Sequence, residues 1–357
     1  MKKLPDSLQH PILREINPIK TMFLQKRPPK VLLLGDRTAS RTALANALFS
    51  EPVAKADEDH VQVGNWQLFS HGHGRMRILD ARRPAAPALL KRALETDAPD
   101  ICLFLHSEPR AAEDLAADFD QARQVIDLLR AKNGTAVPPI IGVSVSCLDS
   151  SDPETARRHL SNALFDKSRN GFSDKVTGVY VLHGGTGEAH PLARAIALEI
   201  PPEAKLEMGR LSGVREVQRE LANVIIKSVS AISLAIGTQP IPLADLPILT
   251  SLQAAMVAAI MHISGREMSM KLAGEWIAAL GANIGLAIAL REGARATLKF
   301  VPIWGDFVSG GIAALGTYSI GRAAAAYFIE GITLGDAQKL FKRTKKKDLP
   351  PLLTPKA

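Results

Sequence analysis

Between residues 30 and 201 the chain alternates short apolar runs with stretches of helical spacing. The apolar runs have the length of strands, and we expect strands at residues 30–34, 61–69, 75–80, 100–106, 139–145 and 177–182. The stretches between them predict helices at residues 41–49, about 87–96, 110–132, 153–164 and 189–199. Strands that alternate with helices indicate an α/β fold, in which a mostly parallel sheet carries helices on both faces.

From about residue 204 the strand pattern disappears. The chain becomes rich in alanine, glycine and isoleucine at helical spacing, which predicts a C-terminal all-α domain. Pro240-Ile241-Pro242 is expected to break one long helix and Gly265 another. The expected divisions are an N-terminal extension (1–29), the α/β domain (30–201), a linker helix (202–239), the helical domain (240–338) and a basic tail (339–357).

Two segments of the helical half, 273–290 and 300–321, approach membrane character. Either is barely long enough, because a spanning helix needs about 20 largely apolar residues. Each carries one acidic residue, Glu275 or Asp306, at a cost of roughly 2.5–3.5 kcal/mol on insertion scales. The helical half is therefore expected to be either a soluble or peripheral bundle or a membrane-inserted one.

The second of these segments carries a small residue at every fourth position. On a helix these residues form a stripe that lets another helix approach closely. The stripe fits a helical hairpin in water or in lipid, and it consists of Gly305, Ser309, Ala313, Thr317, Gly321 and Ala325.

Positive charge is concentrated at the C-terminus. The formal net charge is +8 and the pI about 9.5. A cluster of this kind binds phosphate on lipid or nucleic acid, or it is a solvated tail. Because Phe341 is the only aromatic residue within it, nucleic acid is not favoured and an anionic membrane surface is the expected partner. Its residues are Lys339, Lys342, Arg343, Lys345, Lys346 and Lys347.

The two cysteines, Cys102 and Cys147, lie in apolar, strand-like runs. They predict buried thiols in a reducing compartment rather than a disulfide framework. Lys2 and Lys3 have no apolar stretch behind them, so no signal peptide is expected. The expected location is the cytoplasm, at the inner face of the membrane.

The first apolar run leads into a loop with the frame of a Walker A motif. Gly35 is followed by four residues and then by Ser40-Arg41-Thr42, where the intact motif has Gly-Lys-Thr. In such a loop, backbone N–H groups and the following helix N-terminus cradle phosphates. Ser40 restricts the backbone where glycine frees it, and Arg41 is longer and planar where lysine is a compact charge.

By strand order and motif placement, residues 30–201 resemble the Era/TrmE-like family of Ras-fold GTPases. The resemblance implies a P-loop GTPase-like sheet with one site for GTP or GDP with Mg²⁺, in which Thr42 binds the metal. Five motifs at strand ends build that site in the family. The corresponding positions are Gly35, Ser40, Arg41, Thr42, Asp80 and Asp149.

The remaining family motifs are also altered. No threonine occurs between Thr42 and Thr96 to fill the switch position, and Ser50 lies too near the first helix. Asp80-Ala81-Arg82-Arg83 has Arg83 where glycine would meet the γ-phosphate, and Pro84 follows without an N–H. The guanine motif keeps only its aspartate in Ser146-Cys147-Leu148-Asp149. Leu182-His183-Gly184 replaces the last motif.

Three ordered runs in the helical half resemble the YcjF-like helical domain of unknown function. They are 245–256, 298–306 and 314–323, within a match of about residues 240–335. That domain often follows Era-like GTPase domains in bacterial proteins. The resemblance implies membrane association and no known chemistry.

Three hypotheses follow. The chain is a pseudo-GTPase that acts as a membrane-associated scaffold, a divergent GTP-binding protein whose nucleotide state controls the helical domain, or a membrane-anchoring or remodelling protein. No catalytic residue is predicted. If the chain is an enzyme, it is a GTP hydrolase. His71 and His73 share a strand face but lack a third ligand, so a metal site is not expected there.

Overall fold

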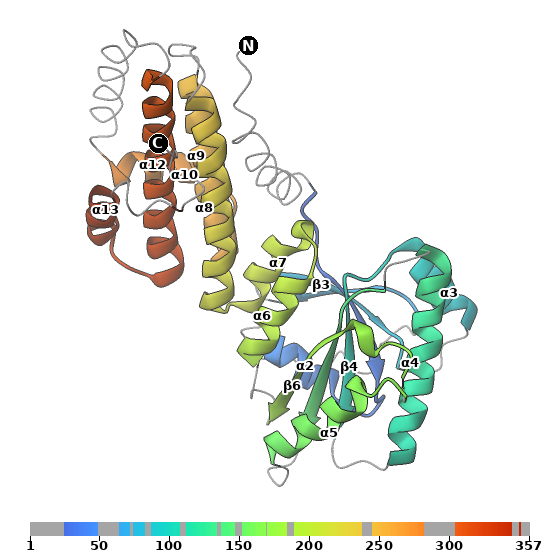
Figure 1. Ribbon diagram of the computed structural model, residues 1–357. Coiled ribbons are helices and arrows are strands. Elements are labelled where there is room, and N and C mark those ends of the chain that lie inside the picture. Colours follow the sequence, from blue (N-terminus) through green and yellow to red (C-terminus); the bar gives the residue numbers. More distant parts are fainter. Residues whose placement is uncertain are drawn as a thin grey trace. The chain divides into compact units, whose positions relative to one another are not determined.

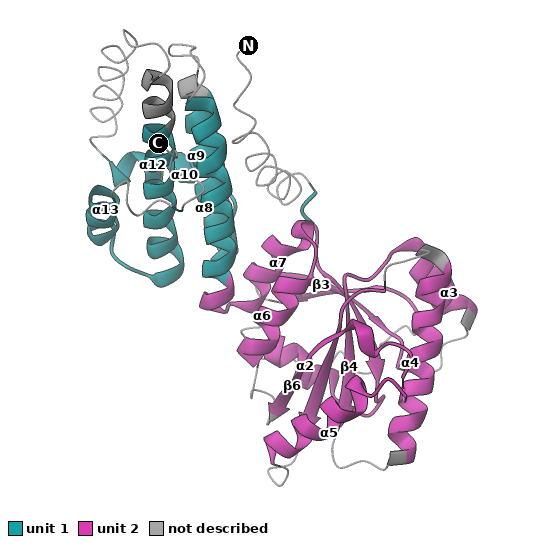
Figure 2. Cartoon of the chain, viewed as in Figure 1, with its two compact units in different colours: residues 1–26, 218–357 teal, residues 27–217 magenta. Residues whose placement is uncertain are grey.

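The computed structural model of the chain divides into two compact units, residues 27–217 and residues 1–26 with 218–357 (Figure 2). The described residues are 25–48, 64–71, 74–82, 87–107, 112–133, 137–146, 152–168, 170–183, 189–237, 245–281, 304–344 and 350.

Residues 27–217 contain a six-stranded sheet in the order β2-β3-β1-β4-β5-β6 (Figure 1). Every pairing is parallel except β2 with β3, so the predicted α/β fold with a mostly parallel sheet is confirmed. The strands are β1 (Lys30–Gly35), β2 (Gln67–His71), β3 (Gly74–Asp80), β4 (Ile101–Ser107), β5 (Ile140–Ser146) and β6 (Val176–His183).

The second expected strand was placed too early. Residues 64–66 form a turn in which Gly64 has φ +82°, a backbone that other residues rarely adopt, and β2 begins only at Gln67. Residues 61–63 lie outside the described residues. The remaining strands lie within two residues of their predicted bounds.

The helices of this unit are α2 (Arg41–Leu48), α3 (Pro87–Thr96), α4 (Ala112–Asn133), α5 (Pro153–Phe165), α6 (Ala189–Glu199) and α7 (Pro202–Ser212). The first five follow the predicted order. The predicted linker helix 202–239 is divided, because Gly213, with φ +60°, ends α7, and α8 (Arg215–Gly237) begins after it. Helix α5 begins where the Asp152 carboxylate accepts the backbone N–H of Thr155 at 3.1 Å. The short 3₁₀ turn η2 (Ser173–Lys175) precedes β6.

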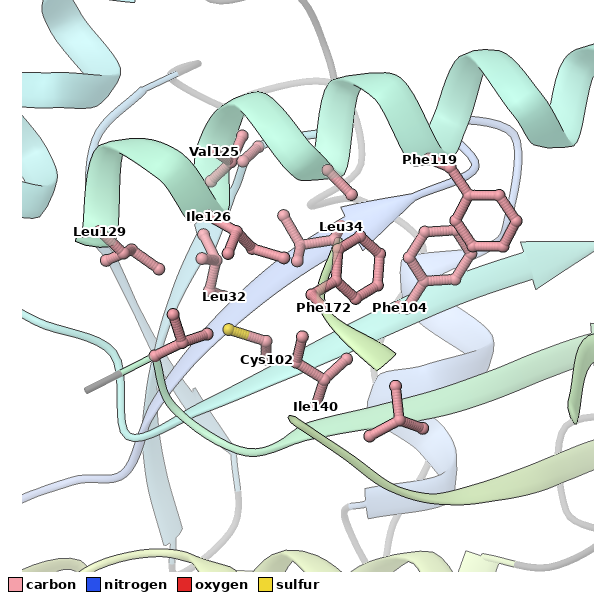
Figure 3. Packing of buried hydrophobic residues seen from close by; sticks show 14 of the residues in the cluster. Leu32, Leu34, Cys102, Phe104, Phe119, Val125, Ile126, Leu129, Ile140 and Phe172 are labelled. Carbon is pink, nitrogen blue, oxygen red and sulfur yellow. The ribbon is translucent and has the colours of Figure 1, made fainter. Parts of the chain in front are cut away.

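The core on one face of the sheet lies between β1, β4, β5 and the helices α3, α4 and α5. Phe104 of β4 stacks on Phe119 of α4, with ring centroids 5.1 Å apart (Figure 3). Cys102 lies in the same layer, and burial raises the pKa of its thiol to about 12, so this cysteine is buried as expected. Cys147 lies outside the described residues.

The second unit is helical, as predicted. It contains residues 218–237 of α8 (Arg215–Gly237), then α9 (Asp245–Ile263), α10 (Met270–Leu280), α12 (Trp304–Ala325), the π-helix η3 (Ala326–Glu330) and α13 (Leu334–Arg343). Gly265, with φ +91°, lies in the turn after α9, which confirms it as a helix breaker. The expected break at residues 240–242 lies outside the described residues.

The small-residue stripe of α12 packs against other helices at the positions whose side chains are described. A Cβ at Gly321 would lie 2.6 Å from Ile226 Cγ1, so glycine is required for the close approach of α8. Thr317 donates to Ser233 Oγ at 2.9 Å and accepts from Gln253 Nε2 at 3.0 Å. The side chains at positions 305 and 309 lie outside the described ones.

Among the described residues only α8 is long and apolar enough to cross a membrane, and 67% of its apolar window is buried. The described parts of the two predicted segments do not pass the same test. The described part of 273–290 belongs to α10, which has 11 residues. Residues 282–303, which hold the rest of that segment and the start of 300–321, lie outside the described residues.

Candidate phosphate-loop site

The loop between β1 and α2 depends on glycine at position 35. Gly35 has φ +87°, and a Cβ there would lie 2.4 Å from the carbonyl oxygen of Leu105. The same carbonyl accepts the backbone N–H of Asp36 at 2.9 Å. The start of the loop thus lies close against the carboxyl end of β4.

Asp36 holds the start of the loop in place. Its buried carboxylate accepts the backbone N–H and the hydroxyl of Thr38, both at 2.7 Å. It also accepts the Ser107 backbone N–H at 3.2 Å and the Ser107 hydroxyl. Because these donors come from the loop and from the end of β4, the carboxylate ties the two together.

Ser40 is the N-cap of α2. Its hydroxyl oxygen accepts the Ala43 backbone N–H at 3.1 Å, and its carbonyl oxygen accepts the Leu44 N–H at 3.3 Å. A phosphate in such a loop binds N–H groups of this first turn. One of them is already satisfied by the side chain that replaces the family's glycine.

The carboxylate of Asp80 is paired with Arg82. Arg82 Nε donates to Asp80 Oδ1 at 3.0 Å and Nη2 donates to Oδ2 at 2.9 Å, a bidentate fork. The Arg82 backbone N–H also donates to Oδ1, at 3.1 Å. Both carboxylate oxygens are therefore occupied by one residue that lies two positions further along the chain.

Arg82 also reaches the loop between β1 and α2. Its Nη1 donates to the carbonyl oxygens of Ala39 at 2.7 Å and of Asp36 at 3.0 Å. Arg82 is 4% exposed and Asp80 is 6% exposed. A single guanidinium group thus joins the end of β3 to the loop after β1 in the protein interior.

The electrostatics follow from this pairing. Burial alone would raise the pKa of Asp80, but the hydrogen bonds and charge of Arg82, helped by the charge of Arg41, outweigh burial and hold this pKa below its usual value. Arg41 Nε lies 3.6 Å from Asp80 Oδ2. Asp80 is therefore ionised at neutral pH, with two guanidinium groups beside it.

The residues present do not fit a Mg²⁺ ion at Asp80. A magnesium ion needs free oxygen lone pairs at close range, and the Asp80 oxygens already accept from Arg82. Two positive charges beside the carboxylate would also repel the ion. Thr42, the predicted metal ligand, lies at the second position of α2, and its role stays a prediction.

Most of the predicted site residues lie close together. Parallel pairing of β1 with β3 brings Asp80 to the edge of the sheet where the loop of Gly35, Ser40 and Arg41 lies. Asp149, Arg83 and Pro84 lie outside the described residues. Within the described residues no group of three or more metal-ligating side chains occurs.

Arg82 was not singled out in the sequence. It stands in the quoted run 80–83 at a position that the family motif leaves variable. The only available signal was an arginine two residues after the aspartate of a buried strand. Asp36 and Ser107 were missed as well, because their contact joins positions 71 residues apart.

No family model matches the chain. Among curated proteins it is similar to translation initiation factor IF-2 of Erythrobacter litoralis, with 24% identity over 148 residues. That match covers 41% of this chain and 16% of the factor's own length.

Two solved structures are similar to half of the chain. Toc33 of Arabidopsis thaliana, a dimerization-deficient mutant, matches with 17% identity and a TM-score of 0.32, covering 51% of this chain and 81% of that one. A structure titled for the GTPase activity of the chloroplast translocon components atToc33 and psToc159 matches with 17% identity, a TM-score of 0.31 and 51% and 79% coverage. The strand order and the parallel pairings, rather than these matches, carry the assignment of residues 27–217 to an α/β fold with a mostly parallel sheet.

Proposed function

We propose that the chain is a pseudo-GTPase, a GTPase-like domain that does not turn over GTP and acts as a scaffold at a membrane surface. The pairing of Asp80 with Arg82 carries this proposal. The carboxylate that would support Mg²⁺ is already neutralised, and Ser40 satisfies one N–H at the phosphate end of α2. The domain keeps the shape of a nucleotide site without the groups that the chemistry needs.

The alternative is a divergent GTP-binding protein whose nucleotide state controls the helical domain. The retained loop geometry at Gly35 favours this alternative. The two hypotheses differ in one property, because a ligand that binds only the native state raises the apparent stability. Under the alternative, GTP or GDP with Mg²⁺ raises the melting temperature.

The test is a single-turnover GTP hydrolysis assay with Mg²⁺, combined with a calorimetric titration of GDP. Thr42→Ala is the matched control, since it removes the hydroxyl predicted to bind the metal. We expect no turnover above the Thr42→Ala background and no heat of GDP binding at millimolar nucleotide. Turnover that Thr42→Ala abolishes would falsify the proposal, and binding without turnover would favour the alternative.

The membrane part of the proposal concerns the helical unit, through its resemblance to the YcjF-like domain. Lys339, Lys342 and Arg343 are exposed on α13, which begins at a Thr333 N-cap. Met268, Met270 and Leu272, at 40–49% exposure, lie together at the start of α10. Exposed cations with exposed apolar side chains are the features that bind an anionic bilayer surface from one side.

A liposome sedimentation assay tests this part separately. We expect the chain to sediment with anionic vesicles and not with neutral ones, and sodium chloride should weaken the binding. Replacing Lys339, Lys342 and Arg343 by alanine should leave the chain in the supernatant. Alanine at Lys91, Arg158 and Lys167, three exposed cations of the α/β unit, is the charge-matched control. Equal loss in both triple variants would mean that only net charge matters.

A further inference from the structure

Four oxygen atoms converge on the guanidinium group of Arg82. Two belong to the Asp80 carboxylate, at 2.9 and 3.0 Å. The other two are the carbonyl oxygens of Ala39 and Asp36, at 2.7 and 3.0 Å. Carboxylate and backbone carbonyl oxygens are the donors that hard divalent cations take in proteins. The surroundings of Arg82 therefore have the chemistry of a cation site.

We infer that Arg82 is an internal cation that fills a latent divalent-cation site and fixes the phosphate loop without metal or nucleotide. This inference deepens the proposed function, because it rests on the proposed absence of Mg²⁺ at Asp80. In a metal-dependent loop, an ion that comes and goes links the loop to the strand-end carboxylate. Here a covalently attached side chain makes that link.

Arginine suits this task for physical reasons. Its guanidinium group is charged at every physiological pH and carries only donors, five N–H groups, so it can serve the four oxygens at once. Its fork fits a carboxylate with two parallel hydrogen bonds. Because the group is attached to the chain two residues from Asp80, its effective concentration at the site is high and constant. The loop is therefore fixed without an added ion wherever Asp80 is ionised.

The decisive experiment removes the internal cation and offers soluble ones. Arg82→Ala leaves the four oxygens and a space the size of the guanidinium group. We expect the melting temperature of the variant to fall by roughly 10 °C. Magnesium chloride, calcium chloride or about 20 mM guanidinium chloride, far below the molar range in which guanidinium unfolds proteins, should restore part of that loss. The same salts should not raise the melting temperature of the wild type.

Three controls make the rescue specific. Sodium chloride at equal ionic strength controls for screening. Arg77→Ala removes an arginine of β3 that pairs with a carboxylate, Asp97, away from the loop, and the melting temperature of this variant should not rise with the added ions. Because Arg41 Nε already lies 3.6 Å from Asp80, rescue is also measured in Arg41→Ala/Arg82→Ala, where Arg41 cannot take over.

A second measurement does not depend on a variant that folds. Hydrogen exchange of the wild-type backbone amides at residues 35–44 should be the same with EDTA, with Mg²⁺ and with Mg²⁺ and GTP. Faster exchange in EDTA would overturn the inference, since it would show that a bound metal fixes the loop. Absence of rescue in both alanine variants, or equal rescue in Arg77→Ala, would overturn it as well.

The two proposals fail separately. Suppose that the wild type hydrolyses GTP, that hydrogen exchange at residues 35–44 is the same with and without EDTA, and that cations raise the melting temperature of Arg82→Ala. The scaffold proposal is then lost and the role of Arg82 stands. If the wild type neither binds nor hydrolyses GTP and no cation rescues the variants, the scaffold proposal stands and the latent site is lost.

Discussion

Each of two edges of the same sheet carries a bidentate ion pair between an arginine and an aspartate, called a fork below. At the carboxyl edge Arg82 grips Asp80, and the two side chains are 3% and 5% exposed. At the amino edge Arg27 grips Asp100 with two bonds of 2.7 Å, and these side chains are 26% and 6% exposed. The forks have the same chemistry, and they differ in what surrounds them.

The remaining donors show the difference. Arg27 also donates to a second carboxylate, that of Glu203 at the start of α7, and its side chain is partly exposed to water. Arg82 also donates to two carbonyl oxygens of the loop between β1 and α2, and its side chain is enclosed by protein. The amino-edge fork joins segments of the chain at the surface. The carboxyl-edge fork joins the end of β3 to the loop between β1 and α2 in the interior.

The largest expected effect is that of Arg82→Ala. The substitution leaves Asp80 as a buried charge without its fork, and we expect a loss of about 3–5 kcal/mol in the free energy of unfolding. Urea denaturation followed by circular dichroism measures it. The double variant with Asp80→Ala should lose less than the sum of the single variants. Additive losses would show that the two side chains do not act as a pair.

The next effect concerns acid. Because the pKa of Asp80 is lower in the folded chain than its ordinary value of 3.8, the pair contributes stability that is fully present above that value. This contribution is lost as the pH falls from about 4 through the lower folded pKa. We expect the wild type to lose more stability than Arg82→Ala between pH 5 and pH 2, by urea denaturation. If the free energies of unfolding of the two proteins fell in parallel with pH, Arg82 would not be the group that lowers the pKa of Asp80.

A smaller effect is expected for Arg27→Ala at the amino edge. Asp100 keeps the backbone N–H of Lys30 at 2.9 Å, and water reaches the fork, so we expect a loss of roughly 1–3 kcal/mol. Hydrogen exchange of the β1 and β4 amides measures the change within this unit. A loss as large as that of Arg82→Ala would mean that the difference in burial does not determine how much each ion pair contributes to the free energy of unfolding.

The smallest effect is expected at Ser40. Ser40→Ala removes the N-cap of α2 and should cost about 1 kcal/mol, whereas Ser40→Gly should cost only a few tenths. Thermal unfolding of the two variants beside the wild type measures both. If Ser40→Ala destabilised the chain as much as Arg82→Ala, the helix cap and not the guanidinium group would hold the loop.

Much of the fold could be predicted because the signals are local. The period of apolar residues predicted the strands and helices of the α/β unit, and only β2 was placed too early, where Gly64 turns the chain. Gly35 could be assigned to a loop from its place after a buried strand. Asp80 could be assigned to the same edge, since parallel strands end together. These steps need only neighbouring residues and the geometry of a parallel sheet.

By itself, the sequence determined the alternation of strands and helices, the all-helical second half and the glycine at position 35. Only the tertiary structure decided what Arg82 does. Its partners in the loop lie 43 and 46 residues away, and the pairing of β1 with β3 brings them within reach. A local pattern records which face of an element is buried, but it does not record which distant oxygen atoms a buried guanidinium group will meet.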